Sequence, residues 1–244
     1  MDKIVSIAIF YFFSLSLVIP SGYSVGAVLV FIISILNIRK LSLGNVQKSE
    51  VIQLLVFAVY FISFCVLNIY HNEAFREYDI PSRFLFILPI FFLLMHCKVD
   101  GRYYWLGVGV GGLLAGGLAG WQYFILGMGR SEGYTNPIQY ADISILLGVL
   151  SMIGLIWGYR FFRSGWFMFI MFSGSIMGAL GALLTGSRGA WVALPVGIVL
   201  CLIYLKNILQ VKYFFLVTLV LFFIMASISM VPSVEHRIVI AAQE

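Results

Sequence analysis

Nine long apolar runs follow one another along the chain, separated by short stretches that are polar or carry glycine and proline. A helix needs about 20 apolar residues to cross a bilayer, so the pattern predicts an all-α fold, a polytopic transmembrane helical bundle. Residues 1–231 would form the membrane domain, and residues 232–244 would begin a loop outside it. The expected spans are 4–19, 23–38, 51–69, 83–97, 103–128, 138–159, 165–185, 190–205 and 211–231.

The composition excludes several classes of protein. Of the 244 residues, 62% are hydrophobic and 10% are charged, whereas an ordinary soluble domain has about 25% charged residues. A soluble globular protein, a disordered chain and a disulfide scaffold are therefore excluded. A transmembrane β-barrel is excluded as well, because its strands alternate and need few long apolar runs. The three cysteines lack the spacing of a metal site or a disulfide framework, so we expect no metal and no cofactor.

The first apolar run follows a lysine, as the hydrophobic part of a signal peptide would. Pro20-Ser21-Gly22 then leads directly into the next run without a small-residue cleavage site. We therefore expect residues 4–19 to remain in the protein as its first span.

The net charge of +5 would suggest a nucleic-acid partner if the protein were soluble. In a membrane protein it reports orientation, because cytoplasmic loops collect lysine and arginine. With the N-terminus in the cytoplasm, the inner segments carry ten basic and three acidic residues, and the outer segments carry five arginines and seven acidic residues. We therefore expect a cytoplasmic N-terminus, a C-terminal end outside and no nucleic-acid partner.

The segment TGSRGAW (185–191) interrupts two apolar runs and places Arg188 at or near the membrane. An arginine at membrane depth costs about 2.5–3.5 kcal/mol on insertion scales, and such residues usually face a cavity. The helix expected after the break would point its N-terminal amides toward it, which favours an anion such as a pyrophosphate. An arginine that snorkels to the outer interface beside a tight turn explains the segment equally well.

Two further stretches combine polar residues with the start of a span. Asn136 and Pro137 are typical of a helix N-cap and its first position, and Asp142 follows in the first turns. Asp79 and Arg83 open another span, where either the two residues pair with each other or Arg83 lines the same outer cavity as Arg188. The glycines of residues 103–128 have small-xxx-small spacing, which predicts close helix packing.

The segment TGSRGAW resembles the signature of the O-antigen ligase and O-antigen polymerase family. The stretches DIPSR (79–83) and GYTNPIQYAD (133–142) are similar to the ligase branch, as is the short tail with Arg237 after the last run. The resemblance extends over essentially the whole chain. It implies a membrane glycosyltransferase that uses polyprenyl-pyrophosphate-linked glycans, with its active face on the periplasmic side of the bacterial inner membrane.

For the ligase branch, the resemblance implies transfer of a glycan from undecaprenyl pyrophosphate to a lipid A–core sugar during lipopolysaccharide biosynthesis. Arg188 and Arg237 would be the catalytic residues that bind the pyrophosphate, and Arg83 and Asp142 would help to bind the lipid-linked glycan. The implied partners are the undecaprenyl-pyrophosphate-linked glycan, the lipid A–core acceptor and membrane lipids. The family's catalytic histidine lies in a large outer loop, and no position up to Glu244 matches this histidine. The chain therefore resembles an N-terminal portion of a family member.

Three alternatives stay open. A polymerase of the same family would join repeat units on the lipid carrier. A transporter or channel would be expected to place ionisable groups near the middle of the bilayer, often in paired broken helices, whereas the sequence shows one such break. A fragment without activity is the third, because the expected base is missing.

Overall fold

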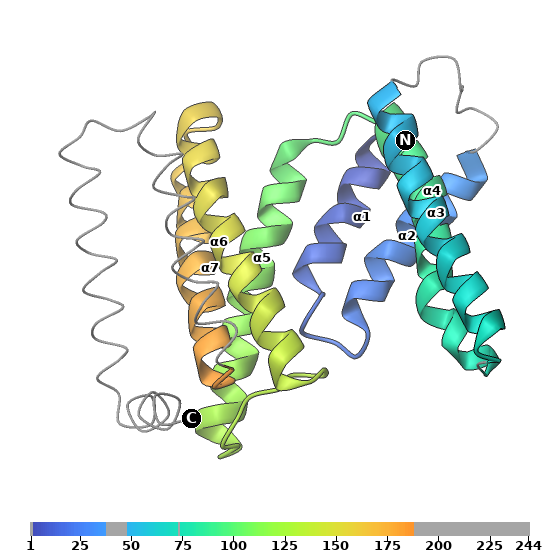
Figure 1. The fold of residues 1–244 in the computed structure, drawn as a ribbon. Coiled ribbons are helices and arrows are strands. Elements are labelled where there is room, and N and C mark those ends of the chain that lie inside the picture. The colour runs from blue at the N-terminus through green and yellow to red at the C-terminus, as the bar shows by residue number, and fades with distance from the viewer. Residues whose placement is uncertain (1, 38–47, 73, 188–244) are drawn as a thin grey trace, which may run out of the picture. The chain divides into compact units, whose positions relative to one another are not determined.

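The computed structural model describes residues 2–37, 48–72 and 74–187, which are helices and short connections without a strand in these ranges. The all-α prediction is confirmed for this part of the chain. The elements in chain order are α1 (Asp2–Ser14), α2 (Gly22–Asn37), α3 (Lys48–Tyr70), the short 3-10 helix η3 (Phe75–Tyr78), α4 (Asp79–His96), α5 (Gly101–Gly120), the π-helix η4 (Trp121–Ile125), α6 (Pro137–Phe161) and α7 (Gly165–Leu184) (Figure 1).

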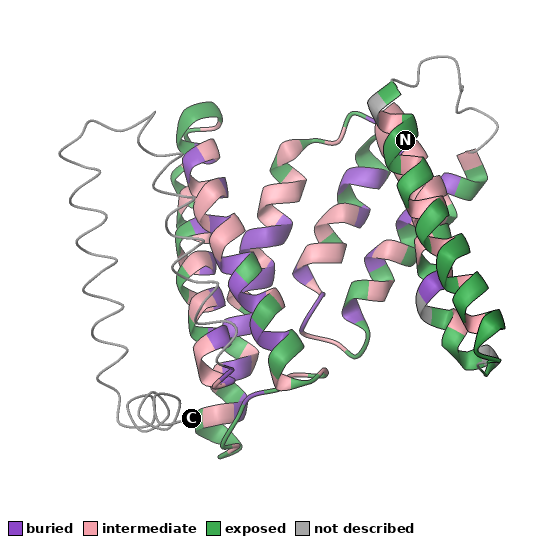
Figure 2. Cartoon of the chain, viewed as in Figure 1, coloured by how far each residue is buried: buried purple, intermediate pink, exposed green. Residues whose placement is uncertain are grey.

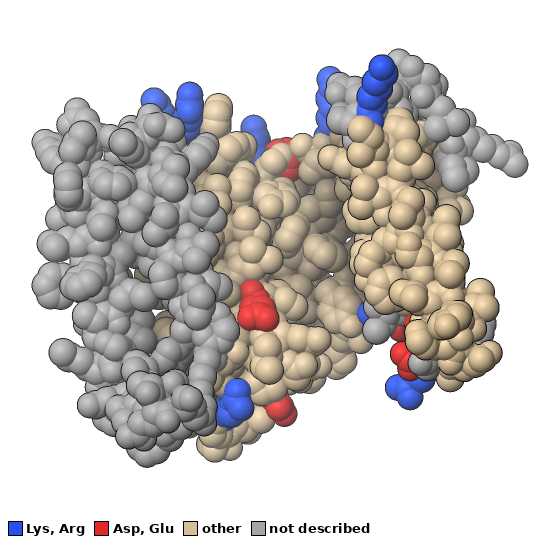
Figure 3. Space-filling model, viewed as in Figure 1, with Lys and Arg blue, Asp and Glu red and all other residues tan. Residues whose placement is uncertain are grey.

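Five helical segments in the described ranges are long and apolar enough to cross a membrane. They correspond to the third to seventh predicted spans, and they indicate a membrane protein. Charged side chains are sparse on the visible face of the described residues (Figure 3). The predicted spans 190–205 and 211–231, and the segment 232–244, lie outside the described residues. The five segments are Glu50–Tyr70, Arg76–His96, Gly101–Ile125, Pro137–Phe161 and Gly165–Leu184.

The first predicted span differs from the structure, because α1 ends at Ser14 and not near residue 19. The hydroxyl of Ser16 donates a hydrogen bond to the carbonyl oxygen of Phe13 at 2.9 Å, which replaces a bond of the helix ladder. Ser21 then takes a positive φ of 54° directly before α2 begins. At 1.5 Å per residue, α1 is about 20 Å long, shorter than the roughly 30 Å hydrocarbon core.

The chain divides into two compact units. Unit 1 comprises Met1–Phe12 and Tyr23–Tyr104, and unit 2 comprises Phe13–Gly22 and Trp105–Glu244. The boundary near residue 12 lies within α1, so the helix continues from one unit into the other. Each unit is described by itself below.

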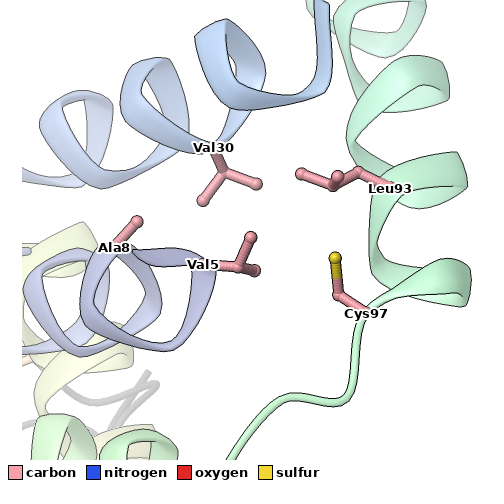
Figure 4. Close-up of a cluster of buried hydrophobic side chains, with 5 residues drawn as sticks. All are labelled: Val5, Ala8, Val30, Leu93 and Cys97. Atoms are coloured by element: carbon pink, nitrogen blue, oxygen red, sulfur yellow. The ribbon is translucent and has the colours of Figure 1, made fainter. Parts of the chain in front are cut away.

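Unit 1 has an apolar core at the place where α1, α2 and the end of α4 meet (Figure 4). Val5 and Ala8 from α1 and Val30 from α2 face Leu93 and Cys97, and all five side chains are buried. The chain after α4 is tied to this core, because the backbone N–H of the aspartate at position 100 donates to the hydroxyl of Ser6 at 3.1 Å.

The helices α3 and α4 form an antiparallel pair joined by η3 in unit 1 (Figure 1). Their contact is aromatic: the ring of Tyr60 lies 4.3 Å from that of Phe84, measured between centroids. Most of the remaining surface of α3 is exposed (Figure 2). Because this surface is apolar, it suits a lipid environment.

Unit 2 packs α5, α6 and α7 through glycines. A methyl group added at Gly112 would lie less than 3.0 Å from the carbonyl oxygen of Gly174, and one added at Gly174 would meet that of Gly109 in the same way. One turn further along α7, the hydroxyl of Ser144 in α6 donates to the carbonyl oxygen of Gly178 at 2.8 Å. The predicted close packing of the glycine-rich span is confirmed, and α7 is one of its partners.

Candidate functional site

Several polar groups of unit 2 gather where η4 ends, α6 begins and α7 ends. Successive helices of a bundle run in opposite directions, so the loop 126–136 lies at the same end as the last turn of α7 (Figure 1). The backbone N–H of Ser131 donates to the carbonyl oxygen of Leu184 at 3.2 Å, which fixes this proximity. We call Gln122, Arg130, Ser131 and Thr185 the loop cluster.

Gln122 holds the loop to the end of α5. Its side chain is 7% exposed, and its carbonyl oxygen accepts hydrogen bonds from the backbone N–H groups of Glu132 at 3.1 Å and Gly133 at 2.9 Å. Its amide nitrogen donates to the carbonyl oxygen of Gly133 at 3.2 Å. Gln122 lies within the π-helix Trp121–Ile125, and single π-helical turns are frequent at functional sites.

Arg130 and Ser131 close the C-terminal end of α7. The last carbonyl groups of a helix have no partner within the helix, and here Arg130 Nε donates to the carbonyl oxygen of Thr185 at 2.9 Å. The fully buried Ser131 donates its hydroxyl to the carbonyl oxygen of Ala119 at 2.9 Å. A cation near a helix C-terminus is also favoured by the helix dipole.

The residues that follow α7 form a compact turn. Thr185 is fully buried and its hydroxyl donates to the carbonyl oxygen of Ala182 at 2.7 Å. The hydroxyl oxygen of Thr185 accepts in turn from the backbone N–H of Ser187 at 3.1 Å. Gly186 has a φ of 64°, a conformation that favours glycine. Arg188 comes next in the sequence, and both Arg188 and Arg237 lie outside the described residues.

The start of α6 confirms the predicted cap. The side-chain oxygen of Asn136 accepts from the backbone N–H of Gln139 at 2.8 Å, and Pro137 is the first helical residue. Tyr140, fully buried, donates its hydroxyl to the carbonyl oxygen of Ala115 at 2.6 Å. Asp142 lies in the second turn and is exposed, with no ion pair to another described residue.

Arg83 and Asp79 pair with each other in unit 1. Arg83 Nη2 lies 2.6 Å from Asp79 Oδ2, one helical turn apart, and the two side chains are 57% and 62% exposed. This is the simpler of the two alternatives that the sequence left open. Exposed pairs of this kind contribute about 0–1 kcal/mol. Arg83 belongs to unit 1 and Asp142 to unit 2, so the structure does not bring these two predicted residues into one described site.

The sequence interpretation missed the loop cluster. The sequence interpretation treated Arg130 only as one of the five arginines of the outer segments. It assigned no role to Gln122, which lies in an apolar run. A glutamine in such a run was a usable signal, because polar residues in a membrane-spanning segment are rare and usually have partners.

A comparison with known proteins found a distant similarity. No protein-family profile matches the chain. A protein of Haemophilus influenzae (strain ATCC 51907 / DSM 11121 / KW20 / Rd), named as an uncharacterized protein, is 26% identical over 214 residues, which cover 85% of this chain and 52% of that protein. The chain therefore spans about half the length of this relative.

Proposed function

We propose that the chain is part of a membrane glycosyltransferase of the O-antigen ligase type. Such an enzyme moves a glycan from undecaprenyl pyrophosphate to a lipid A–core sugar at the periplasmic face of the inner membrane. The proposal includes nine spans, a cytoplasmic N-terminus and a periplasmic loop that begins at residues 232–244. Its first support is the resemblance of TGSRGAW, DIPSR and GYTNPIQYAD to the family.

The turn at Thr185–Ser187 is the structural observation that carries the proposal. Its groups are hydrogen-bonded and buried at the end of an apolar helix, and the next residue is Arg188. The resemblance assigns pyrophosphate binding to Arg188, and a hydrogen-bonded turn directly before that residue in the sequence supports a site at this end of α7. A site that binds a phosphate group with defined geometry needs fixed surroundings of this kind.

The proposed reaction is a displacement at the anomeric carbon of the lipid-linked sugar. An acceptor hydroxyl forms the new C–O bond, its proton goes to a base, and the electron pair of the broken C–O bond leaves with the pyrophosphate. Arg188 would bind the pyrophosphate and Arg237 would bind it from the loop side, which stabilises the charge that develops in the transition state. Arg83 and Asp142 would contact the lipid-linked glycan.

The test is a transfer assay with the full-length gene product in membranes that contain the lipid-linked glycan and the lipid A–core acceptor. Arg188→Ala is expected to abolish transfer, and Arg188→Lys to restore only part of it, because lysine cannot bind two phosphate oxygens with a planar fork. Arg160→Ala is the matched control, since Arg160 is an exposed arginine at the opposite end of α6.

Each other outcome changes the proposal in a defined way. Full transfer by Arg188→Ala would remove Arg188 from the site, and full transfer by Arg188→Lys would contradict two-point binding of phosphate. A deletion strain that carries single repeat units on its core would indicate the polymerase. Free core with accumulated lipid-linked polymer supports the ligase.

A further inference from the structure

We infer that the turn between α6 and α7 is a contact surface for anionic phospholipid headgroups, in which Arg160 and Arg163 bind the phosphate groups. Both helices are long and apolar enough to cross a membrane, and residues 162–164 connect them. So short a connection lies where both spans end, at the level of the lipid headgroups. The inference does not rest on the proposed function, because this turn lies at the end of α6 opposite to the loop 126–136.

Aromatic side chains lie on both sides of this turn in the chain. The ring of Trp157 lies 5.7 Å from that of Phe161 and 6.0 Å from that of the buried Phe167, measured between centroids. Trp166 and Phe169 stack at 5.9 Å, and both are exposed. Tryptophan is enriched where lipid headgroups meet the hydrocarbon, because its ring is apolar and its N–H is polar. The aromatic side chains therefore indicate that this end of α6 and α7 lies at the membrane surface.

The charge at this turn is positive in the described part of unit 2. Arg160 and Arg163 are both exposed, and Figure 3 shows basic side chains at the end where α6 and α7 connect. The acidic residues among residues 105–187 are Glu132 and Asp142. Asp142 lies about 27 Å from Arg160 along α6, at 1.5 Å per residue, and Glu132 precedes the helix. Neither of these carboxylates can neutralise the turn, and its charge is complementary to that of an anionic headgroup.

Arg163 occupies a backbone position that normally selects glycine. Its φ is 49°, and its N–H donates to the carbonyl oxygen of Gly158 at 2.7 Å, which ends α6. Helices commonly end in this conformation with glycine, because a Cβ atom makes it unfavourable for most other residues. The backbone alone therefore does not explain an arginine here, whereas a surface that needs a cation does. A cation is also favourable at a helix C-terminus, and the experiment below separates that contribution from lipid contact.

Arg160 is positioned by an exposed ring. Its Cζ lies 5.4 Å from the centroid of the Phe161 ring, and Phe161 is 63% exposed. A contact over a ring uses the face of the guanidinium and none of its N–H groups. Arg160 can therefore keep this contact while its N–H groups donate to phosphate oxygens.

The experiment measures the thermal midpoint of the full-length gene product in nanodiscs of phosphatidylcholine, with and without one third phosphatidylglycerol. A lipid that binds only the folded protein raises the midpoint. Arg163→Gly and Arg160→Gln are each expected to reduce this rise by about 2–4 °C, because each removes one positive charge at an anionic surface. In pure phosphatidylcholine, Arg163→Gly is expected to stay within about 2 °C of the wild type, because glycine suits the backbone at this position.

Two controls match the two parts of the change. Asn72→Gly replaces a residue with a similar φ of 52° and removes no charge. Arg76→Gln removes an exposed arginine from a segment that also carries Glu77 and Asp79, which do not favour anionic lipid. Both variants are expected to show the full rise of the wild type.

The outcomes separate lipid contact from a structural role of the two arginines. A reduced rise in Arg163→Gly and Arg160→Gln, with unchanged midpoints in pure phosphatidylcholine, supports the inference. If both variants keep the full rise, or if the wild type shows none, the inference is wrong. Midpoints lowered equally in both lipids would show that the arginines only stabilise the end of α6. An equal loss in Arg76→Gln would indicate a general effect of charge and contradict a defined surface.

Discussion

The close contact of α5 with α7 permits a quantitative test with two glycines of one helix. A methyl group at Gly112 would lie less than 3.0 Å from the carbonyl oxygen of Gly174, whereas one at Gly117 would meet nothing within 4 Å. Ordinary contact begins near 3.4 Å, so Gly112→Ala forces the two backbones apart by at least about 0.4 Å.

Both substitutions gain the helix propensity of alanine, and only Gly112→Ala adds a cost of overpacking. Replacing glycine by alanine inside a helix stabilises it by about 0.8–1 kcal/mol. Gly117→Ala should therefore raise the free energy of unfolding by up to about 1 kcal/mol. Gly112→Ala adds an overpacking cost of about 1–3 kcal/mol, and packing is the main force between helices in a membrane. We expect Gly112→Ala to be less stable than Gly117→Ala by about 1–3 kcal/mol.

The assay is reversible unfolding of the full-length gene product in mild detergent by titration with sodium dodecyl sulfate, followed by far-ultraviolet circular dichroism. The comparison between the two variants removes the helix-propensity contribution, which is common to both. A difference below about 0.5 kcal/mol would refute the reasoning, because α5 and α7 could then not be in the contact that the structure shows.

Two further predictions concern the loop cluster and the core of unit 1. Gln122→Met removes three hydrogen bonds to the backbone of the loop, and at about 1 kcal/mol each it should destabilise the protein by about 2–4 kcal/mol. Gln122→Glu keeps the acceptor and should cost less in the same unfolding assay; equal losses would contradict this account. Burial raises the pKa of the Cys97 thiol, and Asp2 raises it further, so the unfolded chain ionises first and stability should fall as pH rises above about 8.5. Unfolding free energies measured between pH 7 and 10 should show this fall in the wild type and in Cys65→Ala, and a smaller one in Cys97→Ala.

Local chemistry explains which parts of the fold could be predicted. The side chains of Asn136 and Pro137 specify where α6 begins, and the structure shows the N-cap at Asn136 as predicted. The glycines near Gly112 predict close packing because their spacing repeats along one helix face. Both signals lie within a few residues of the feature that they specify.

The end of α1 could not be predicted from hydrophobicity. The apolar run continues to Ile19, but α1 ends at Ser14 and Ser16 bonds to the backbone of Phe13. Hydrophobicity reports that a segment avoids water, and a turn surrounded by apolar groups satisfies that condition as well as a helix does. A serine whose hydroxyl competes for the hydrogen bonds of the backbone determines locally where the helix ends.

The loop cluster escaped prediction for a different reason. Arg130 and Thr185 are 55 positions apart in the chain, and their contact follows from the packing of α5, α6 and α7. No repeating pattern of residues in the sequence indicates such a contact. What the sequence does show is an isolated polar residue in an apolar run, and Gln122 illustrates that such a residue deserves a search for partners.

The hydrogen bonds of the loop also determine how well its backbone is ordered. The N–H groups of Ser131, Glu132 and Gly133 all have partners, and so does the carbonyl oxygen of Gly133. An unpaired backbone group is costly in apolar surroundings, so these bonds favour one arrangement of the loop. Gln122 makes three of these bonds, so it holds the loop in place next to the end of α5.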